Sequence, residues 1–159
     1  RYLDALRADL ESALPQIWGR RVHTVFIGGG TPSLFSPDSI DRLLSDIRAR
    51  LPLEADAEIT LEANPGTFET DRFKAFRQAG VNRLSIGVQS FDDAKLKALG
   101  RVHNRAQAIA AVEEAQRNFE TFNNRHSKTG GHKVSTSRVG AGTVAEKPGF
   151  TLPSWDSVR

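Results

Sequence analysis

Apolar positions follow two different periods along the chain, that of strands and that of helices. Short apolar runs that end in polar residues predict strands at 22–27, 58–62 and 83–88. Apolar residues repeat every three or four positions elsewhere, which predicts helices at about 1–14, 37–51, 70–79, 92–99 and 105–119. The alternation of strands and helices indicates an α/β fold with parallel strands.

Local signals mark several helix ends. Pro15 is expected to stop the first helix, because proline removes a backbone donor. Ser36 followed by Pro37 is typical of an N-cap and a first helical position. Asn104 and Gln107 resemble a reciprocal capping pair, so we expect the last helix to begin there.

The composition changes near residue 120. Ser, Thr, Gly, Asn and Lys dominate residues 121–144, and such a stretch buries too little apolar surface to offset its ordering entropy. We therefore expect a folded region at 1–119 and a disordered or unrelated tail at 120–159, with no strand between 123 and 137. Residues 140–145 match the letters of a dinucleotide-binding fingerprint, but no predicted strand precedes them, and Pro148 limits any helix that follows.

Composition narrows the class of protein. The 159 residues fit a single domain, but the chain contains no Met and its first residues already follow a helical pattern, so we expect a piece of a longer protein. The absence of Cys excludes disulfides and an iron–sulfur cluster held by this chain's own thiolates. Without a signal-peptide pattern or an apolar run of about 18 residues, the default expectation is a cytoplasmic protein with no membrane span.

The net charge of +3 comes from the tail. Residues 1–119 hold sixteen basic and sixteen acidic side chains, whereas residues 120–159 hold six basic and three acidic side chains. Binding to nucleic acid requires clustered basic groups, so we expect no nucleic-acid partner.

Three consecutive glycines, residues 28–30, follow the first predicted strand. Because they lack Cβ atoms, their backbone can approach a ligand closely and offer free N–H groups. Thr31 adds a hydroxyl at the same place. A tight turn that needs positive φ is the simpler interpretation, and the lysine and spacing of a Walker loop are missing.

Further polar groups are expected at the same edge, because the carboxyl ends of parallel strands lie on one rim. The carboxylate of Glu62 can accept two ribose hydroxyls, and the amide of Gln89 can donate and accept. Arg101 can hold a carboxylate with two hydrogen bonds. The simpler interpretations are a solvated strand end, a hydrogen bond to backbone, and a charge that balances Asp92 or Asp93.

Three segments together resemble the radical S-adenosylmethionine (SAM) core of the HemW-type heme chaperones and of their relatives, the oxygen-independent coproporphyrinogen III oxidases. The segments are FIGGGTPS at 26–33, LEANP at 61–65 and NRLSIGVQSF at 82–91. The similarity runs from about residue 2 to residue 120. LGRVH at 99–103, with the Pro-Ser of the first segment, favours the chaperone branch.

The resemblance implies a partial parallel (β/α) barrel with three βα units. It places Gly29, Gly30 and Thr31 at the methionine part of SAM, Glu62 and Gln89 near its ribose, and Arg101 near its carboxylate. The family's cluster motif, C-x3-C-x2-C, belongs on a strand before residue 1, and this chain has no Cys. The heme-contacting region should follow residue 120, where the tail departs from the family.

The resemblance implies that the intact protein is a heme chaperone that depends on SAM and a 4Fe-4S cluster and delivers heme to acceptor proteins. An oxidase that decarboxylates coproporphyrinogen III is the alternative. A generic nucleotide or phosphate binder with an α/β fold is a third possibility. For the chain itself we expect little or no catalysis, no catalytic or metal-ligating residue, and weak SAM affinity.

Overall fold

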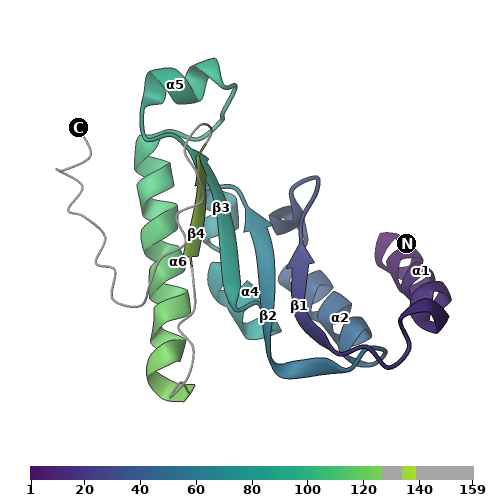
Figure 1. Ribbon diagram of the computed structural model, residues 1–159. Helices are drawn as coiled ribbons and strands as arrows, with labels where there is room; N and C mark the ends of the chain where they lie inside the picture. Colours follow the sequence, from purple (N-terminus) through teal and green to yellow (C-terminus); the bar gives the residue numbers. More distant parts are fainter. Residues whose placement is uncertain (127–133, 139–159) are drawn as a thin grey trace.

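The computed structural model describes residues 1–126 and 134–138. Its elements, in chain order, are α1 (Tyr2–Ile17), β1 (Val22–Ile27), the 3-10 turn η1 (Pro32–Leu34), α2 (Pro37–Arg48), β2 (Leu53–Ala63), α3 (Thr67–Thr70), α4 (Phe73–Ala79), β3 (Arg83–Gln89), α5 (Asp93–Ala98), α6 (Arg105–His126) and β4 (Val134–Arg138). The strands form one parallel sheet in the order β1-β2-β3-β4 (Figure 1). The predicted α/β class and partial parallel barrel are confirmed.

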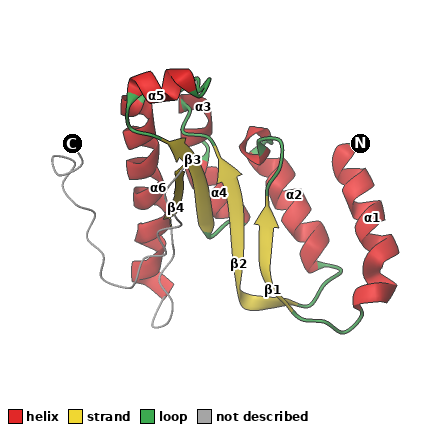
Figure 2. Ribbon diagram, turned by 45° about the horizontal axis from the view of Figure 1, so that its top comes forward, coloured by secondary structure: helices red, strands yellow, loops and turns green. Residues whose placement is uncertain are grey.

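The sheet has an apolar face and a polar face. Helices α2, α4 and α6 lie along the same side of the strands (Figure 2). In β3, Leu84, Ile86 and Val88 are buried, and the alternating Ser85 and Gly87 are only partly buried. Because successive side chains of a strand point to opposite faces, the sheet packs on its helices with one face and keeps polar groups on the other.

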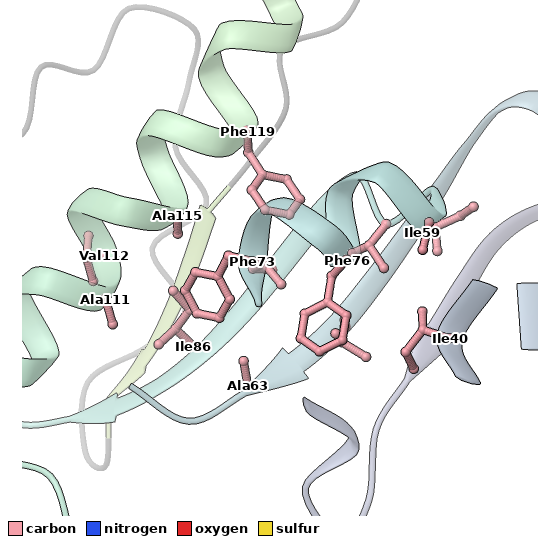
Figure 3. Packing of buried hydrophobic residues seen from close by; sticks show 14 of the residues in the cluster. Ile40, Ile59, Ala63, Phe73, Phe76, Ile86, Ala111, Val112, Ala115 and Phe119 are labelled. Carbon is pink, nitrogen blue, oxygen red and sulfur yellow. The ribbon is translucent and has the colours of Figure 1, made fainter. Parts of the chain in front are cut away.

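Aromatic side chains fill the space between the helices and the sheet (Figure 3). Phe73 and Phe76 of α4 are 0% exposed, and Phe119 of α6 packs in the same cluster. Ile40 and Leu44 bring α2 into this cluster. Burial of a large apolar side chain contributes about 1.5–3 kcal/mol, so these residues hold the three helices against the sheet.

Asn82 joins β2 to β3 just before β3 begins. Its side-chain Oδ1 accepts a hydrogen bond from the Ile59 N–H at 2.7 Å, and its Nδ2 donates to the Ala57 carbonyl at 2.8 Å. These bonds hold the register in which Glu62 lies opposite Ser85. The side chain of Asn82 therefore aligns the polar ends of the two strands.

The first helix, α1, is longer than predicted, and it contacts the rest of the chain through side chains that are not buried. It continues through Pro15 to Ile17, because a proline in the last turn removes only one of the final hydrogen bonds. None of the residues of α1 is buried. Arg42 of α2 forms an ion pair with Asp4, and Arg50 lies 2.7 Å from Glu11.

The prediction for the region after residue 119 is wrong in two respects. Helix α6 continues to His126, and β4 pairs with β3 in parallel, with Leu84 opposite Val134. The sequence of β4 has only one apolar residue, so its conformation follows from the available edge of β3 rather than from its own pattern. Residues 127–133 and 139–159, including the fingerprint-like 140–145, lie outside the described residues, and the boundary at 119/120 stays a prediction.

The predicted caps are confirmed. Ser36 Oγ accepts a hydrogen bond from the Ser39 N–H at 3.2 Å. Asn104 Oδ1 accepts from the Gln107 N–H at 2.9 Å, and Gln107 Oε1 accepts from the Asn104 N–H at 3.0 Å. Among the described helices, none combines the length and the apolar character that crossing a bilayer requires.

Candidate functional site

A cleft of about 170 Å³ lies at the carboxyl ends of β1, β2 and β3. Five of the six residues proposed from sequence line it, namely Gly29, Thr31, Glu62, Gln89 and Arg101. The sixth, Gly30, lines a separate apolar groove of about 460 Å³ between α1, β1 and α2. The fold thus brings groups from Gly29 to Arg101 to one place, as expected for the rim of a parallel sheet.

The glycine loop approaches Glu62 closely. The Gly29 N–H donates to Glu62 Oε2 at 3.3 Å, and the φ of Gly29 is 112°, which favours glycine. A methyl group at Gly28 would lie 2.6 Å from Phe26 Cε1 and 3.1 Å from Glu62 Oε2. The loop therefore serves both as a positive-φ turn and as a place where backbone and carboxylate meet.

Backbone strain is concentrated at the cleft. In the described part of the chain, the non-glycine residues with positive φ are Thr31, at 61°, and Gln89, at 66°, and both line the cleft. Such a conformation costs on the order of 1–3 kcal/mol and persists where the surroundings enforce it. Strain of this kind is frequent in ligand sites, which supports a binding role for the cleft.

Five further cleft residues were not among the predicted site residues: Pro32, Ala63, Asn64, Ser85 and Gly87. A methyl group at Gly87 would lie 3.4 Å from Gln89 Nε2 and 3.6 Å from Asn64 Oδ1, so both side-chain amides border this glycine. Ser85, Gly87 and Gln89 alternate along β3. Because alternate residues of a strand face the same side, the prediction of Gln89 could also have identified Ser85 and Gly87.

Arg101 reaches the cleft from the turn after α5. Gly100 has a φ of 67°, and the Arg101 N–H donates to the Leu96 carbonyl at 2.9 Å, which ends the helix. The suggested acidic partners of Arg101 have other contacts: Asp92 lies 4.0 Å from Lys95 Nζ, and Asp93 accepts a hydrogen bond from a backbone N–H of α6.

The cleft combines one carboxylate, one guanidinium, two amides and two hydroxyls. These groups are complementary to a zwitterionic ligand with hydroxyls, and SAM, an amino acid joined to a nucleoside, is such a ligand. A 4Fe-4S cluster does not fit, because its usual ligands are cysteine thiolates and the chain has no Cys. Within the described residues, no cluster of three or more His, Asp or Glu could hold a metal ion.

Comparison with known proteins identifies the class. The chain belongs to the radical SAM superfamily, which matches residues 4–129. Within this superfamily it is similar to the heme chaperone HemW. It is 56% identical to HemW of Escherichia coli K12 over 114 residues, which are 72% of this chain and 30% of that protein.

The chain is also similar to further HemW and radical SAM proteins. The chain is 44% identical to HemW of Mycobacterium tuberculosis H37Rv over 115 residues, 72% of this chain and 30% of that protein. It is 52% identical to a mitochondrial radical S-adenosyl methionine domain-containing protein 1 of Bos taurus over 100 residues, 63% of this chain and 23% of that protein. Among solved structures, E. coli coproporphyrinogen III oxidase (HemN) matches with a TM-score of 0.66 and 27% identity, covering 86% of this chain and 36% of that one.

These findings confirm the resemblance inferred from the three sequence segments. The chain spans only 23% to 36% of the length of these proteins.

Proposed function

We propose that this chain forms the SAM-binding wall of a HemW-type heme chaperone. The observation that carries the proposal is the convergence of Glu62, Gln89 and Arg101 in one cleft, although each comes from a different strand–helix unit. Their charges and hydrogen-bonding groups complement a zwitterionic nucleoside. The similarity to HemW proteins supports the same assignment.

Each cleft residue that was predicted from sequence has a proposed role. The backbone of Gly29 and the hydroxyl of Thr31 would bind the methionine part of SAM, and Glu62 and Gln89 would hold the ribose hydroxyls. Arg101 would bind the carboxylate through two parallel hydrogen bonds. Gly30 belongs to the same loop but lines the apolar groove, so its place at the methionine part stays a prediction.

The remaining functions concern the intact protein. There we propose a 4Fe-4S cluster held by cysteines outside this chain, binding of heme or a porphyrin, and heme transfer to acceptor proteins. SAM bound beside such a cluster supplies radical chemistry. We also propose that the protein acts in the cytoplasm and has no nucleic-acid partner.

Oxygen-independent coproporphyrinogen III oxidase is the second candidate, supported by the structural match to HemN. The chaperone is favoured, because identity to E. coli HemW is 56% and identity to HemN is 27%. Assays of the intact protein would separate the two. Heme binding without porphyrinogen turnover supports the chaperone, and decarboxylation of coproporphyrinogen III supports the oxidase.

Titration of the 159-residue chain with SAM and with ATP tests the ligand. We expect weak binding of SAM, because a volume of about 170 Å³ is below the roughly 300–1,000 Å³ of complete small-molecule sites. ATP should bind less tightly. A preference for ATP would instead indicate a generic nucleotide-binding domain.

Charge-neutralising variants test the proposed contacts by calorimetry. A hydrogen bond to a charged group contributes about 1.5–3 kcal/mol, so Arg101→Gln and Glu62→Gln should each raise the Kd for SAM about tenfold or more. Arg21→Gln and Glu113→Gln change the same charges at exposed positions away from the cleft, and they should leave the Kd unchanged. Equal effects in both sets would contradict the proposed site.

A further inference from the structure

The turn that presents Gln89 to the cleft is strained and hydrogen-bonded. The Ser90 N–H donates to the Val88 carbonyl at 2.8 Å, which closes a three-residue turn over Gln89. With a φ of 66° at Gln89, this is the rarer, strained form of the γ-turn. The surrounding structure must hold such a turn, because its backbone conformation is unfavourable for a residue with a side chain.

His103 contacts the same carbonyl. Its Nε2 lies 3.0 Å from the Val88 oxygen, and the side chain is buried, with 5% exposure. A carbonyl oxygen can only accept, so the ring donates through a protonated Nε2. Both acceptor positions of the Val88 carbonyl are thereby used, one by the turn and one by His103. His103 itself does not line the cleft.

The same histidine also anchors the segment that carries Arg101. Arg101 is fixed on one side by its N–H bond to the Leu96 carbonyl, at the end of α5. On the other side, Asn104 caps α6 directly after His103. The hydrogen bond from His103 to Val88 therefore joins the short segment between α5 and α6, residues 99–104, to the end of β3, where the turn at Gln89 begins.

We propose that His103 is a positioning residue for the cleft: its bond to the Val88 carbonyl holds the turn of Gln89 and fixes the Arg101 segment beside it. The consequence for SAM rests on the function proposed above, whereas the effect on the turn does not. Without this bond, Gln89 would leave its strained conformation and Arg101 would lose its fixed distance from β3. The two groups would then no longer bind opposite parts of one ligand together.

Two substitutions separate the hydrogen bond from simple filling of space. His103→Gln keeps an N–H at the position of Nε2, and His103→Leu fills a similar volume without a donor. In calorimetric titration of the 159-residue chain with SAM, we expect His103→Leu to raise the Kd about tenfold, as for loss of one hydrogen bond. His103→Gln should stay within about twofold of the parent chain.

A ligand-independent measurement accompanies the titration. The Ser90 amide is part of the turn, so its hydrogen exchange, measured by NMR, should accelerate about tenfold in His103→Leu and hardly change in His103→Gln. If the parent chain binds no SAM but Ser90 responds in this way, the proposed function fails and the positioning role stands.

Three outcomes would overturn the positioning role. The first is unchanged exchange of the Ser90 amide in His103→Leu, and the second is a parent chain that binds SAM with both variants binding it equally well. The third is a His103→Gln chain that loses protection of Ser90. If His103→Leu fails to fold, the decision rests on His103→Gln, and a folded His103→Gln chain with parent-like binding and exchange supports the role.

Discussion

Replacement of Asn82 by alanine should destabilise the chain more than any other asparagine-to-alanine change in a cap or turn that the structure describes. Asn82 makes two side-chain bonds to the backbone of β2, at 2.7 and 2.8 Å, and both are partly buried. Each bond contributes about 0.5–1.5 kcal/mol, and each unsatisfied partner left behind costs about 1–3 kcal/mol. Because the site is only partly buried, we expect a loss of about 2–4 kcal/mol in the free energy of unfolding.

Urea unfolding followed by circular dichroism measures this loss. Asn104→Ala is the matched control, because Asn104 also bonds to backbone but is exposed at a helix start, where loss of a cap costs about 1 kcal/mol. The midpoint for Asn82→Ala should fall well below that of Asn104→Ala, with the same denaturant slope. An Asn82→Ala chain as stable as the Asn104→Ala chain would refute the argument that Asn82 holds the register of β2 and β3.

Three further predictions concern the core, the glycine loop and the first helix. Phe76→Ala should lower the free energy of unfolding by about 3–5 kcal/mol in urea titrations, whereas Leu34→Ala at an exposed position should change it by about 0.5 kcal/mol or less. Gly28→Ala should weaken SAM binding in calorimetry, because the added methyl would lie 2.6 Å from the Phe26 ring, which must shift, and 3.1 Å from the Glu62 carboxylate; unchanged binding would contradict the close approach. The terminal ammonium and Arg42 lower the pKa of Asp4 to about 2 from its usual 3.8. Asp4 therefore stabilises α1 above its usual pKa and loses this effect as the pH falls towards 2, so amide exchange of α1, relative to the rest of the chain, should rise over this range in the parent but not in Asp4→Asn.

The fold was predictable where a local pattern and the tertiary packing agree. The predicted and observed bounds of β1 coincide, because its apolar run is short and glycines follow it. Ser36 and Asn104 mark helix starts through bonds to residues three positions away, so sequence alone reveals them. Strand β4 was missed, because its hydrogen bonds are made with β3 and its own residues carry almost no strand pattern.

The candidate site was predictable to a similar degree. Glu62 and Gln89 stand at the ends of apolar strands, and this position alone brought them to one rim. The strained turn at Gln89 and its contact with His103 were not predictable, because the hydrogen bond joins residues fifteen apart whose proximity depends on the packing of α5 and α6. The sequence places polar groups at the rim, whereas the contacts that orient them depend on the folded chain.

The alternation along β3 separates the wall of the cleft from the layer that supports it. Ser85, Gly87 and Gln89 face the cleft, and Leu84, Ile86 and Val88 face the helices. Under the proposed function, ligand preference can therefore change at one set of positions while the packing behind it stays constant. A library randomised at 85, 87 and 89 should contain more folded members than one randomised at 84, 86 and 88, which makes this strand a suitable starting point for redesigning what the cleft binds.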